Sequence, residues 1–409
     1  MGITRDSRCR GSVPSPVNIP TQLFKYTLRR ETGTAYISDS HAQNLVDDYV
    51  SQLMPQLFRE KEFRLGQINK VFSAKWLNHK QVVFGTKCNK LKVLDTQTSD
   101  VVVIPSLKSS SRSVPAECPC GIHSVAINPS HTLLATGAEF TNDVAVYKLP
   151  SFDPYCVGER AHTDWIFDLC WLDDEYLVTG SRDSNLGLWH IDDVDSGETS
   201  PLWSLQVPEY SIKNPVVVKR CGTAKRVRAL GCLQKRKEVG VLSLNGLFHI
   251  WDVESFSPSQ CRKLPSNIEN VCMCVSQEKT LYGVGSQCHV FLIDPRMKTT
   301  LSVESKFGKV GIRSVSFRND IITFGTGMGH ILFYDLRAKK YLESGCGHFC
   351  SLRLGKGWML HDDNYSQLYN QNIENAIYAH EYDETGTRMF VAGGPLPTSL
   401  WGNYAGLWS

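Results

Sequence analysis

The sequence lacks the features of a membrane-spanning or secreted protein. None of its 409 residues belongs to a run of eighteen consecutive apolar side chains, and the first twenty residues lack the apolar core of a signal peptide. A strong charge of one sign is also absent, because 44 Lys and Arg residues face 41 Asp and Glu residues. The formal charge of +3 does not favour nucleic acid or a membrane surface as the main partner. We therefore expect a soluble intracellular protein whose important basic groups are clustered locally.

Cysteines are present, but without the spacing of disulfide or zinc motifs. The 14 Cys residues are scattered, and several lie in apolar runs such as residues 271–274, which is typical of small buried side chains in a reducing compartment. Segments 118–123 and 346–350 each resemble half of a zinc site, but neither has a convincing second ligand pair. His330, His361 and His380 lack the partners that acid–base catalysis requires. We expect neither an enzyme nor a bound metal or cofactor.

What the sequence does contain is a repeat of three short apolar strands, beginning near residue 68. The second strand of each copy ends in a small residue, and the third ends in an aromatic or aliphatic one. The third strands end near residues 94, 147, 189, 251, 293, 334 and 408, so seven copies are present. Three of the intervals are 41 or 42 residues, which matches the WD40 period of about 40–45 residues. One true Trp-Asp pair occurs, at Trp251 and Asp252.

The third repeat is the best preserved, with His162, Ser181, Asp183 and Trp189 in the positions of the buried polar network of a WD40 blade. We interpret this set as a structural hydrogen-bond network and not as a Ser-His-Asp catalytic triad, because buried polar groups need partners. The sequence therefore predicts an all-β fold, a single seven-bladed WD40 β-propeller over residues 63–409. We expect residues 63–65 to supply the outer strand of the last blade and so to close the ring.

Two segments precede the predicted propeller. Residues 1–37 are rich in Ser, Pro, Thr and Arg without apolar periodicity, and we expect them to be disordered. Residues 38–62 show helical apolar spacing interrupted at Pro55, which predicts an amphipathic helix-loop-helix extension. Two interpretations of this extension remain open, namely packing on the flank of the propeller and docking into a groove of a partner. Among the longer loops, the Ser-rich residues 97–118 are expected to be mobile.

Alignment of the repeats reveals basic residues at equivalent positions. The residues that enter the seven inner strands are Lys70, His123, Ile166, Arg228, Asn270, Arg313 and Ile377. Four of these seven residues are basic or His. The position after the second strand adds Lys87 and Arg182. Because inner strands line the channel of a propeller, these groups should meet at one mouth, where their repulsion favours a bound carboxylate. The alternative is that they pair with acids such as Glu139 or with water. These positions contain no aromatic residue except Tyr378, which argues against nucleic acid.

Several motifs identify a family resemblance over roughly residues 45–409. The runs 69–72, 76–79, 85–89, 164–167, 311–317 and 402–409 are similar to those of cullin-4-associated factor twelve. Such proteins are substrate receptors of cullin-4 RING ubiquitin ligases, held by the DNA-damage-binding adaptor protein, and they transfer no ubiquitin themselves. The resemblance favours docking of the helical extension and of two Trp-Asp-x-Arg-like boxes on the adaptor, although a blade-end salt bridge would also explain the boxes. The residues implied are Leu45, Tyr49, Leu53, Leu57, Phe58, Asp294, Arg296, Asp335 and Arg337.

The family's substrates are proteins that end in paired glutamates. The resemblance therefore implies a binding site for acidic C-termini formed by Lys70, Lys87, His123, Arg182, Arg228 and Arg313. It also implies residence in the cytoplasm and nucleus, although residues 1–22 carry only a few scattered Arg where relatives have a strongly basic tail. The alternative function is a WD40 scaffold that binds acidic protein segments without a ligase. Binding of the adaptor would distinguish the two.

Overall fold

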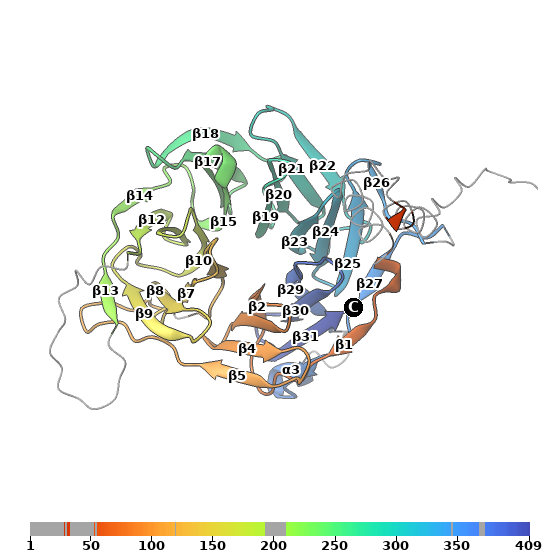
Figure 1. Cartoon of the computed structure of the whole chain (residues 1–409), viewed down its shortest axis with the longest axis horizontal. Coiled ribbons are helices and arrows are strands. Elements are labelled where there is room, and N and C mark those ends of the chain that lie inside the picture. The colour runs from red at the N-terminus through yellow and green to blue at the C-terminus, as the bar shows by residue number, and fades with distance from the viewer. Residues whose placement is uncertain are drawn as a thin grey trace, which may run out of the picture.

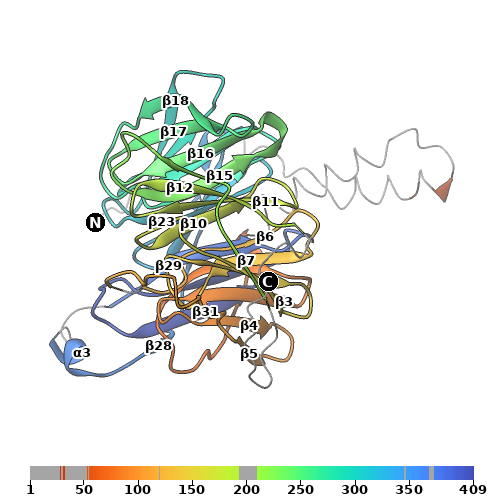
Figure 2. The same ribbon diagram turned by 90° about the vertical axis from the view of Figure 1, so that its left-hand side faces the viewer.

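The computed structural model describes residues 28, 31–32, 53, 55–118, 120–192, 210–344, 347–367 and 373–409. Seven sheets of four or five strands stand around a central channel, with the inner strand of each sheet facing the axis (Figure 1), and their pairing is antiparallel except for β13 (Ser211–Lys213), which pairs in parallel with β9 (Asp153–Gly158). Seen from the side, the ring is a thick disc from which the short helix α3 projects (Figure 2). This arrangement confirms the predicted seven-bladed propeller. Within the described residues, no helix is long and apolar enough to cross a membrane.

Blades 1 to 4 begin in chain order, each running from the inner strand outward, although the outermost strand of blade 2 comes from the segment between the third and fourth strands of blade 3. Blade 1 contains β2 (Val71–Trp76), β3 (Gln81–Thr86), β4 (Leu91–Asp95) and β5 (Val101–Ile104). Blade 2 contains β6 (Val125–Ile127), β7 (Leu133–Gly137), β8 (Val144–Lys148), β9 (Asp153–Gly158) and, beyond β9, β13 (Ser211–Lys213). Blade 3 contains β10 (Ile166–Trp171), β11 (Tyr176–Ser181), β12 (Asn185–His190) and β14 (Val217–Arg220). Blade 4 contains β15 (Val227–Leu233), the 3-10 helix η1 (Gln234–Arg236), β16 (Glu238–Ser243), β17 (Leu247–Asp252) and β18 (Ser257–Lys263).

The remaining three blades complete the ring. Blade 5 contains β19 (Cys272–Ser276), β20 (Leu281–Gly285), β21 (His289–Ile293) and β22 (Thr300–Glu304). Blade 6 contains β23 (Ile312–Arg318), β24 (Ile321–Thr326), β25 (His330–Asp335), β26 (Lys340–Tyr341) and β27 (Ser351–Arg353). Blade 7 contains β29 (Asn375–Tyr382), β30 (Met389–Pro395), β31 (Gly402–Trp408) and β1 (Glu60–Glu62), with β28 (Trp358–Met359) also paired to β31. The helix α3 (Asp363–Gln367) lies between β28 and β29.

The repeated glycine of the second strands is required by the packing between blades. Each core cluster combines side chains from two neighbouring blades, so both faces of a middle strand are buried and its sequence reads as a continuous apolar run. A Cβ atom added at Gly85 would overlap the side chain of Ile122 in the next blade, and one at Gly180 would overlap Val227. Gly85 and Gly180 are thus points of close approach between neighbouring blades, whereas at Gly137 the nearest side-chain atom would be 3.8 Å from an added Cβ.

Closure of the ring differs from the prediction by three residues. The strand that completes blade 7 is β1, whose Glu60 pairs with Trp408 and whose Glu62 pairs with Gly406, so the propeller begins at residue 60 and not at 63. The N–H of Phe63 still donates to the carbonyl of Ala405 at 2.9 Å. The side chains of Phe63 and Leu65 are buried between blades 7 and 1, so they form the core at the seam, whereas the exposed Glu60–Glu62 makes a charged outer edge.

The Ser-rich segment predicted to be mobile is instead held against blade 2. Its first part contains β5, and residues 105–118 are anchored by hydrogen bonds to two buried carboxylates. Ser110 Oγ donates to Glu159 Oε2 and Ser113 Oγ donates to Asp143 Oδ2, both at 2.6 Å. Hydroxyl donors satisfy carboxylates that would otherwise be buried without partners, so this segment is part of the folded structure.

The polar network of blade 3 is structural, as predicted, but its centre is Thr179. The Thr179 hydroxyl lies 2.7 Å from His162 Nε2 and accepts a hydrogen bond from Trp189 Nε1 at 2.9 Å. His162 Nδ1 lies 3.4 Å from the carboxylate of Asp183. Ser181 instead donates to the carbonyl of Asp164. The set therefore links β11 and β12 to the loop that precedes β10, and the buried Ser181 hydroxyl is engaged by a backbone carbonyl.

Replacement of Thr179 by Val tests this network. The substitution keeps the shape of the side chain but leaves His162 and Trp189 without their shared partner in a buried site. We expect it to lower the free energy of unfolding by about 1–3 kcal/mol, measured by urea denaturation followed by tryptophan fluorescence. Thr300→Val on the outer strand β22 is the control. Equal unfolding midpoints for the two variants would show that the network does not stabilise the blade.

Candidate functional site at the channel mouth

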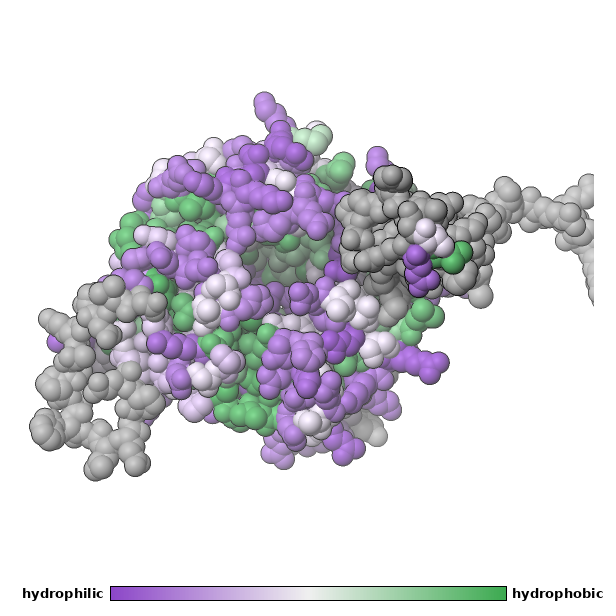
Figure 3. Space-filling view, in the orientation of Figure 1, coloured by the Kyte–Doolittle hydropathy of each residue, from purple (hydrophilic) through white to green (hydrophobic). Residues whose placement is uncertain are grey.

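The central channel contains a cavity of about 690 Å³ lined by all seven inner strands. In the space-filling view it is the hollow at the centre of the ring, with a mostly hydrophilic rim (Figure 3). Its two ends differ, because the inner strands all begin at one end. The predicted basic positions belong to that end, which we call the mouth.

A β-bulge at the start of five inner strands determines which side chains face the mouth. The pairing with the second strand skips one residue in β2, β10, β15, β23 and β29. A bulge changes the direction of the extra residue relative to the alternation of the strand. The skipped residues all line the cavity, together with His123 and Val271, which hold the same register in blades 2 and 5. These seven residues form the mouth ring: Phe72, His123, Phe167, Arg228, Val271, Arg313 and Tyr378.

The sequence alignment placed three of the seven positions correctly. His123, Arg228 and Arg313 were identified, but the aligned Ile166, Asn270 and Ile377 lie one residue before the true positions, and Lys70 lies two residues before. Ile166, Asn270 and Ile377 are buried in the body of the blades. The alignment of the repeats missed these positions because a bulge inserts one residue into a strand. The insertion changes which side chains point toward the channel, and a comparison of strand ends does not detect it.

Arg228 is the cation that the structure leaves most available. Its guanidinium carbon lies 4.8 Å from the centroid of the Phe167 ring, a cation–π distance. Within the described residues, no carboxylate lies within 4.0 Å of its nitrogens. Burial lowers the pKa of Arg228, and the nearby Asp168 opposes this shift. The aromatic ring therefore orients a guanidinium whose hydrogen-bond donors face the cavity without an ion-pair partner.

Arg313 reaches the mouth from blade 6 but already has a carboxylate partner. Its Nη2 lies 2.8 Å from Glu269 Oε2, and the Arg313 side chain is 17% exposed. The Nε atom of Arg313 is buried and has no hydrogen-bond partner among the described residues. The Arg313 guanidinium thus has further N–H donors that its contact with Glu269 does not use.

The two predicted lysines lie together beside the mouth ring and do not line the cavity. Lys70 is only 2% exposed, and its Nζ donates to the carbonyl of Leu400. Burial lowers the pKa of Lys70 to about 7, and repulsion from Lys87 adds to the shift. Lys87 donates through Nζ to the carbonyl of Thr398 at 2.9 Å. Both ammonium groups are therefore held by neutral carbonyls and keep an uncompensated charge when protonated.

Arg182 lies against the neighbouring aromatic side chain, in the same manner as Arg228. Its guanidinium carbon is 4.6 Å from the Trp165 ring centroid, and its Nε is 3.6 Å from the carboxylate of Asp164. The Trp165 indole donates to the carbonyl of Cys118, which fixes the ring that supports Arg182. Two of the three arginines therefore have an acidic partner inside the protein.

His123 was predicted as a titratable cation, but the structure makes it a neutral residue. Its ring stacks on Phe72 with centroids 4.7 Å apart and meets Phe167 edge to face at 5.0 Å. Burial lowers the pKa of His123 to about 3, with further repulsion from Arg228 and Lys87. His123 is therefore uncharged near neutral pH. Its Nε2 is buried without a partner among the described residues and can take part in one hydrogen bond with a ligand.

Aromatic side chains are more frequent at the mouth than the sequence suggested. Phe72, Phe167 and Tyr378 occupy equivalent bulge positions in blades 1, 3 and 7, and Phe72 meets Tyr378 edge to face at 5.4 Å. The signal was present in these three inner strands as an aromatic residue immediately before Ser73, Asp168 or Ala379, which the position of the bulge identifies. These rings contact His123 and Arg228, so they position polar groups and do not stand free as a stacking platform.

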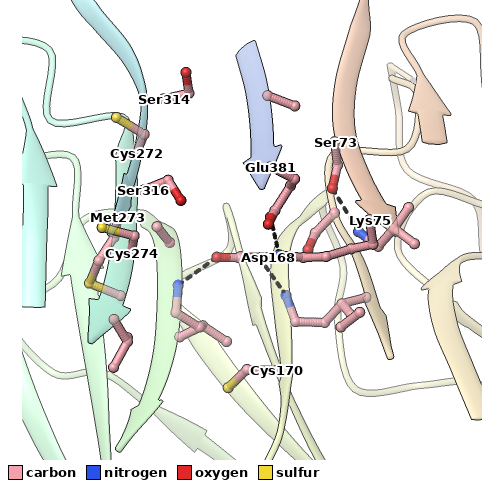
Figure 4. Close-up of a pocket in the computed structure, with 18 of the residues that line it drawn as sticks. Ser73, Lys75, Asp168, Cys170, Cys272, Met273, Cys274, Ser314, Ser316 and Glu381 are labelled. Atoms are coloured by element: carbon pink, nitrogen blue, oxygen red, sulfur yellow. Dashed lines mark hydrogen bonds and ion pairs between the residues drawn. The ribbon is translucent and has the colours of Figure 1, made fainter. Parts of the chain in front are cut away.

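Below the mouth, the channel is polar but internally paired. Lys75 forms an ion pair with Glu381 across two blades, and Asp168 accepts a hydrogen bond from the N–H of Leu230 at 2.7 Å (Figure 4). Cys170, Cys272 and Cys274 line the same region, and burial raises the pKa of each thiol. These thiols are therefore protonated and poor nucleophiles. The charge available for an anionic ligand lies at the mouth.

The predicted adaptor-binding residues ahead of β1 fall into three groups. Leu45 and Tyr49 lie outside the described residues. Leu53 and Leu57 are 38% and 58% exposed, as a docking surface requires. Phe58 is instead buried in the core of blades 6 and 7, so the prediction that it contacts a partner is wrong. Its aromatic ring fills the cluster around Phe333, and this anchors the segment that leads to β1.

The two predicted Trp-Asp-x-Arg-like boxes differ from each other. Arg296 forms a bidentate ion pair with Asp294, at 2.9 and 2.8 Å, which agrees with a blade-end salt bridge. Asp335 instead accepts hydrogen bonds from the backbone N–H groups of Arg337 and Ala338 and so stabilises a turn. The side chains of Arg296 and Arg337 are more than half exposed. Both arginines thus remain accessible on the surface.

A comparison with known protein families agrees with this architecture. The family model described as the DDB1- and CUL4-associated factor 12 beta propeller matches residues 54–409. The match covers more than half of the chain and includes all seven blades together with the closing strand β1. The resemblance noted in the sequence is therefore confirmed, and the chain belongs to the DDB1- and CUL4-associated factor 12 β-propeller family.

Proposed function

We propose that this protein is a substrate receptor of a cullin-4 RING ubiquitin ligase that binds acidic C-termini, in particular those ending in Glu-Glu, at the channel mouth. Membership of the family supports a receptor role associated with DDB1 and CUL4. The observation that carries the ligand class is Arg228, a charged group at the cavity without an ion-pair partner among the described residues. The protein recognises its substrate and leaves ubiquitin transfer to other subunits.

The balance of charge favours a ligand with several carboxylates. Five cationic side chains surround the mouth, and only two carboxylates, those of Asp164 and Glu269, lie within 4.0 Å of any of them among the described residues. Gathering like charges costs free energy that a bound anion recovers. A C-terminal Glu-Glu brings three carboxylates, two from side chains and one from the chain end. The cations available to bind them are Lys70, Lys87, Arg182, Arg228 and Arg313.

The form of the site favours a chain end over an internal segment. The mouth ring surrounds the axis from seven blades, and the Lys75–Glu381 pair lines the narrow channel beneath it. A chain end can enter such a hollow with its carboxylate first, whereas an internal segment would have to enter and return. Arg forks bind carboxylates in a bidentate manner, which suits a terminal carboxylate.

For the adaptor, we propose docking through the exposed leucines ahead of β1. Leu53 and Leu57 are exposed next to the buried Phe58, so the segment is anchored on the propeller while it presents apolar side chains to a partner. Arg296 and Arg337 would lie at the polar rim of such an interface. This arrangement separates the ligase contact from the substrate site at the mouth.

The first prediction concerns ligand binding. We expect Arg228→Ala to weaken binding of a peptide ending in Glu-Glu by about tenfold or more, because one charge-assisted hydrogen bond contributes about 1.5–3 kcal/mol. Isothermal titration calorimetry measures the effect, with the C-terminally amidated and Ala-Ala peptides for comparison. Arg236→Ala, at the opposite end of β15, is the matched control. Equal affinity of the wild-type protein for all three peptides would contradict the proposal.

The second prediction concerns pH. Lys70 has a pKa of about 7 in the free protein, and a bound carboxylate would stabilise its charged form and raise that pKa. Binding therefore takes up a proton above pH 7, so affinity should be highest below pH 7 and fall between about pH 7 and 8.5. Lys70→Arg, which stays charged, should bind with little pH dependence. A pH-independent affinity of the wild-type protein would exclude Lys70 from the site.

Variants of the exposed leucines should affect the adaptor surface without affecting the substrate site at the mouth. Leu53→Glu combined with Leu57→Glu should abolish copurification of DDB1 and CUL4 from cells, because two charges replace apolar contacts, while affinity for the Glu-Glu peptide stays unchanged. Leu301→Glu, at a leucine on the outer strand β22 that is at least as exposed, is the control. Undiminished copurification of the double variant would locate the adaptor contact elsewhere on the chain.

A further inference from the structure

The carboxylate of Glu269 binds one edge of the Arg313 guanidinium at the mouth. Its Oε2 lies 2.8 Å from Arg313 Nη2, an ordinary charge-assisted hydrogen bond. Glu269 belongs to blade 5, just before β19, whereas Arg313 belongs to the mouth ring from blade 6. The Glu269 side chain is 38% exposed, so it faces solvent at the mouth and is not a buried structural acid.

Several local features hold this pair in place. Glu269 has a left-handed backbone with φ of +55°, which is uncommon for a residue other than Gly, Asn or Asp. The turn around it is fixed by hydrogen bonds from Asn270 Nδ2 to the carbonyl of Ser266 and from the N–H of Gln287 to the carbonyl of Ile268. Opposite the pair lies Gly311, where a Cβ atom would come within 2.8 Å of both Glu269 and Arg313. The backbone thus leaves room for this ion pair.

We propose that Glu269 is an intramolecular competitor of the ligand carboxylate at Arg313. This inference rests on the proposed function, since it concerns the same mouth and the same class of acidic chain ends. A ligand carboxylate must displace Glu269 from Arg313 or share the guanidinium with it. Arg228 has no such competitor among the described residues, so its contact with the ligand forms without displacement.

A competitor role and a merely structural role of Glu269 predict opposite changes in ligand affinity when the Glu269 carboxylate is neutralised. If Glu269 competes, its neutralisation frees Arg313 and strengthens ligand binding. If Glu269 only positions Arg313, its neutralisation lets the guanidinium move and weakens binding. Because the pair is partly exposed, its removal should change affinity by no more than about threefold to tenfold.

The test compares Glu269→Gln with the wild-type protein for binding of a peptide ending in Glu-Glu, measured by calorimetry. We expect Glu269→Gln to bind about threefold to tenfold more tightly. The gain should disappear when Arg313→Ala is also present, because nothing is then left to compete for, and the double-mutant cycle measures this coupling. Glu269→Asp, whose shorter side chain withdraws the carboxylate, should give a smaller gain and provides a second variant.

Glu238→Gln is the matched control, because it removes the same charge from a bidentate pair with Arg236 at the opposite end of blade 4. If the wild-type protein binds the peptide but neither Glu269→Gln nor Glu269→Asp binds it more tightly, the inference is overturned and the proposed function stays intact. A gain that persists with Arg313→Ala, or that appears equally in Glu238→Gln, would reveal a general charge effect and also overturn it. Failure of every protein to bind would overturn the proposed function and the inference together.

Discussion

Pairing of β1 with β31 closes the ring, and the contacts at the channel mouth depend on that closure. The pairing joins Glu60 to Trp408, residues from opposite ends of the described propeller, within one blade. Phe63 and Leu65 then fill the seam between blades 7 and 1. Without this seam, the bulge residues of blades 1 and 7 would not meet at the mouth. A repeat protein of this kind gains its site only when its last blade is complete.

Bulges at the starts of the inner strands convert a regular scaffold into a specific surface. In a regular strand the side chains alternate between the channel and the blade interior, and every blade would present a similar residue. In five blades the bulge directs one extra side chain toward the mouth, so that residues far apart in sequence become neighbours. In this protein the extra residues are arginines and aromatic rings, and cation–π contacts orient the guanidinium groups.

Cationic side chains deep in the channel and at its mouth differ in how far neighbouring carboxylates neutralise them. Deep in the channel, Lys75 is paired with Glu381. At the mouth, Arg313 has a single partly exposed partner, and Arg228 has none among the described residues. Because the deep cation is already neutralised by its partner whereas the mouth carries cations in excess of carboxylates among the described residues, anionic ligands should be held at the mouth and not drawn further in. The arrangement explains how a protein with almost no net charge can present a strongly basic site.

The sequence by itself determined the scaffold and the chemical nature of the site. Repeat period, strand endings and the glycines of the second strands are local or periodic properties, so they predicted seven blades, and three of the predicted cationic or His positions line the cavity. Only the tertiary structure decided the rest. The bulges shifted the register by one or two residues, burial made His123 neutral and lowered the pKa of Lys70, Phe58 became a core residue, and Glu269 met Arg313. These outcomes depend on contacts between separate blades, which no local pattern of residues records.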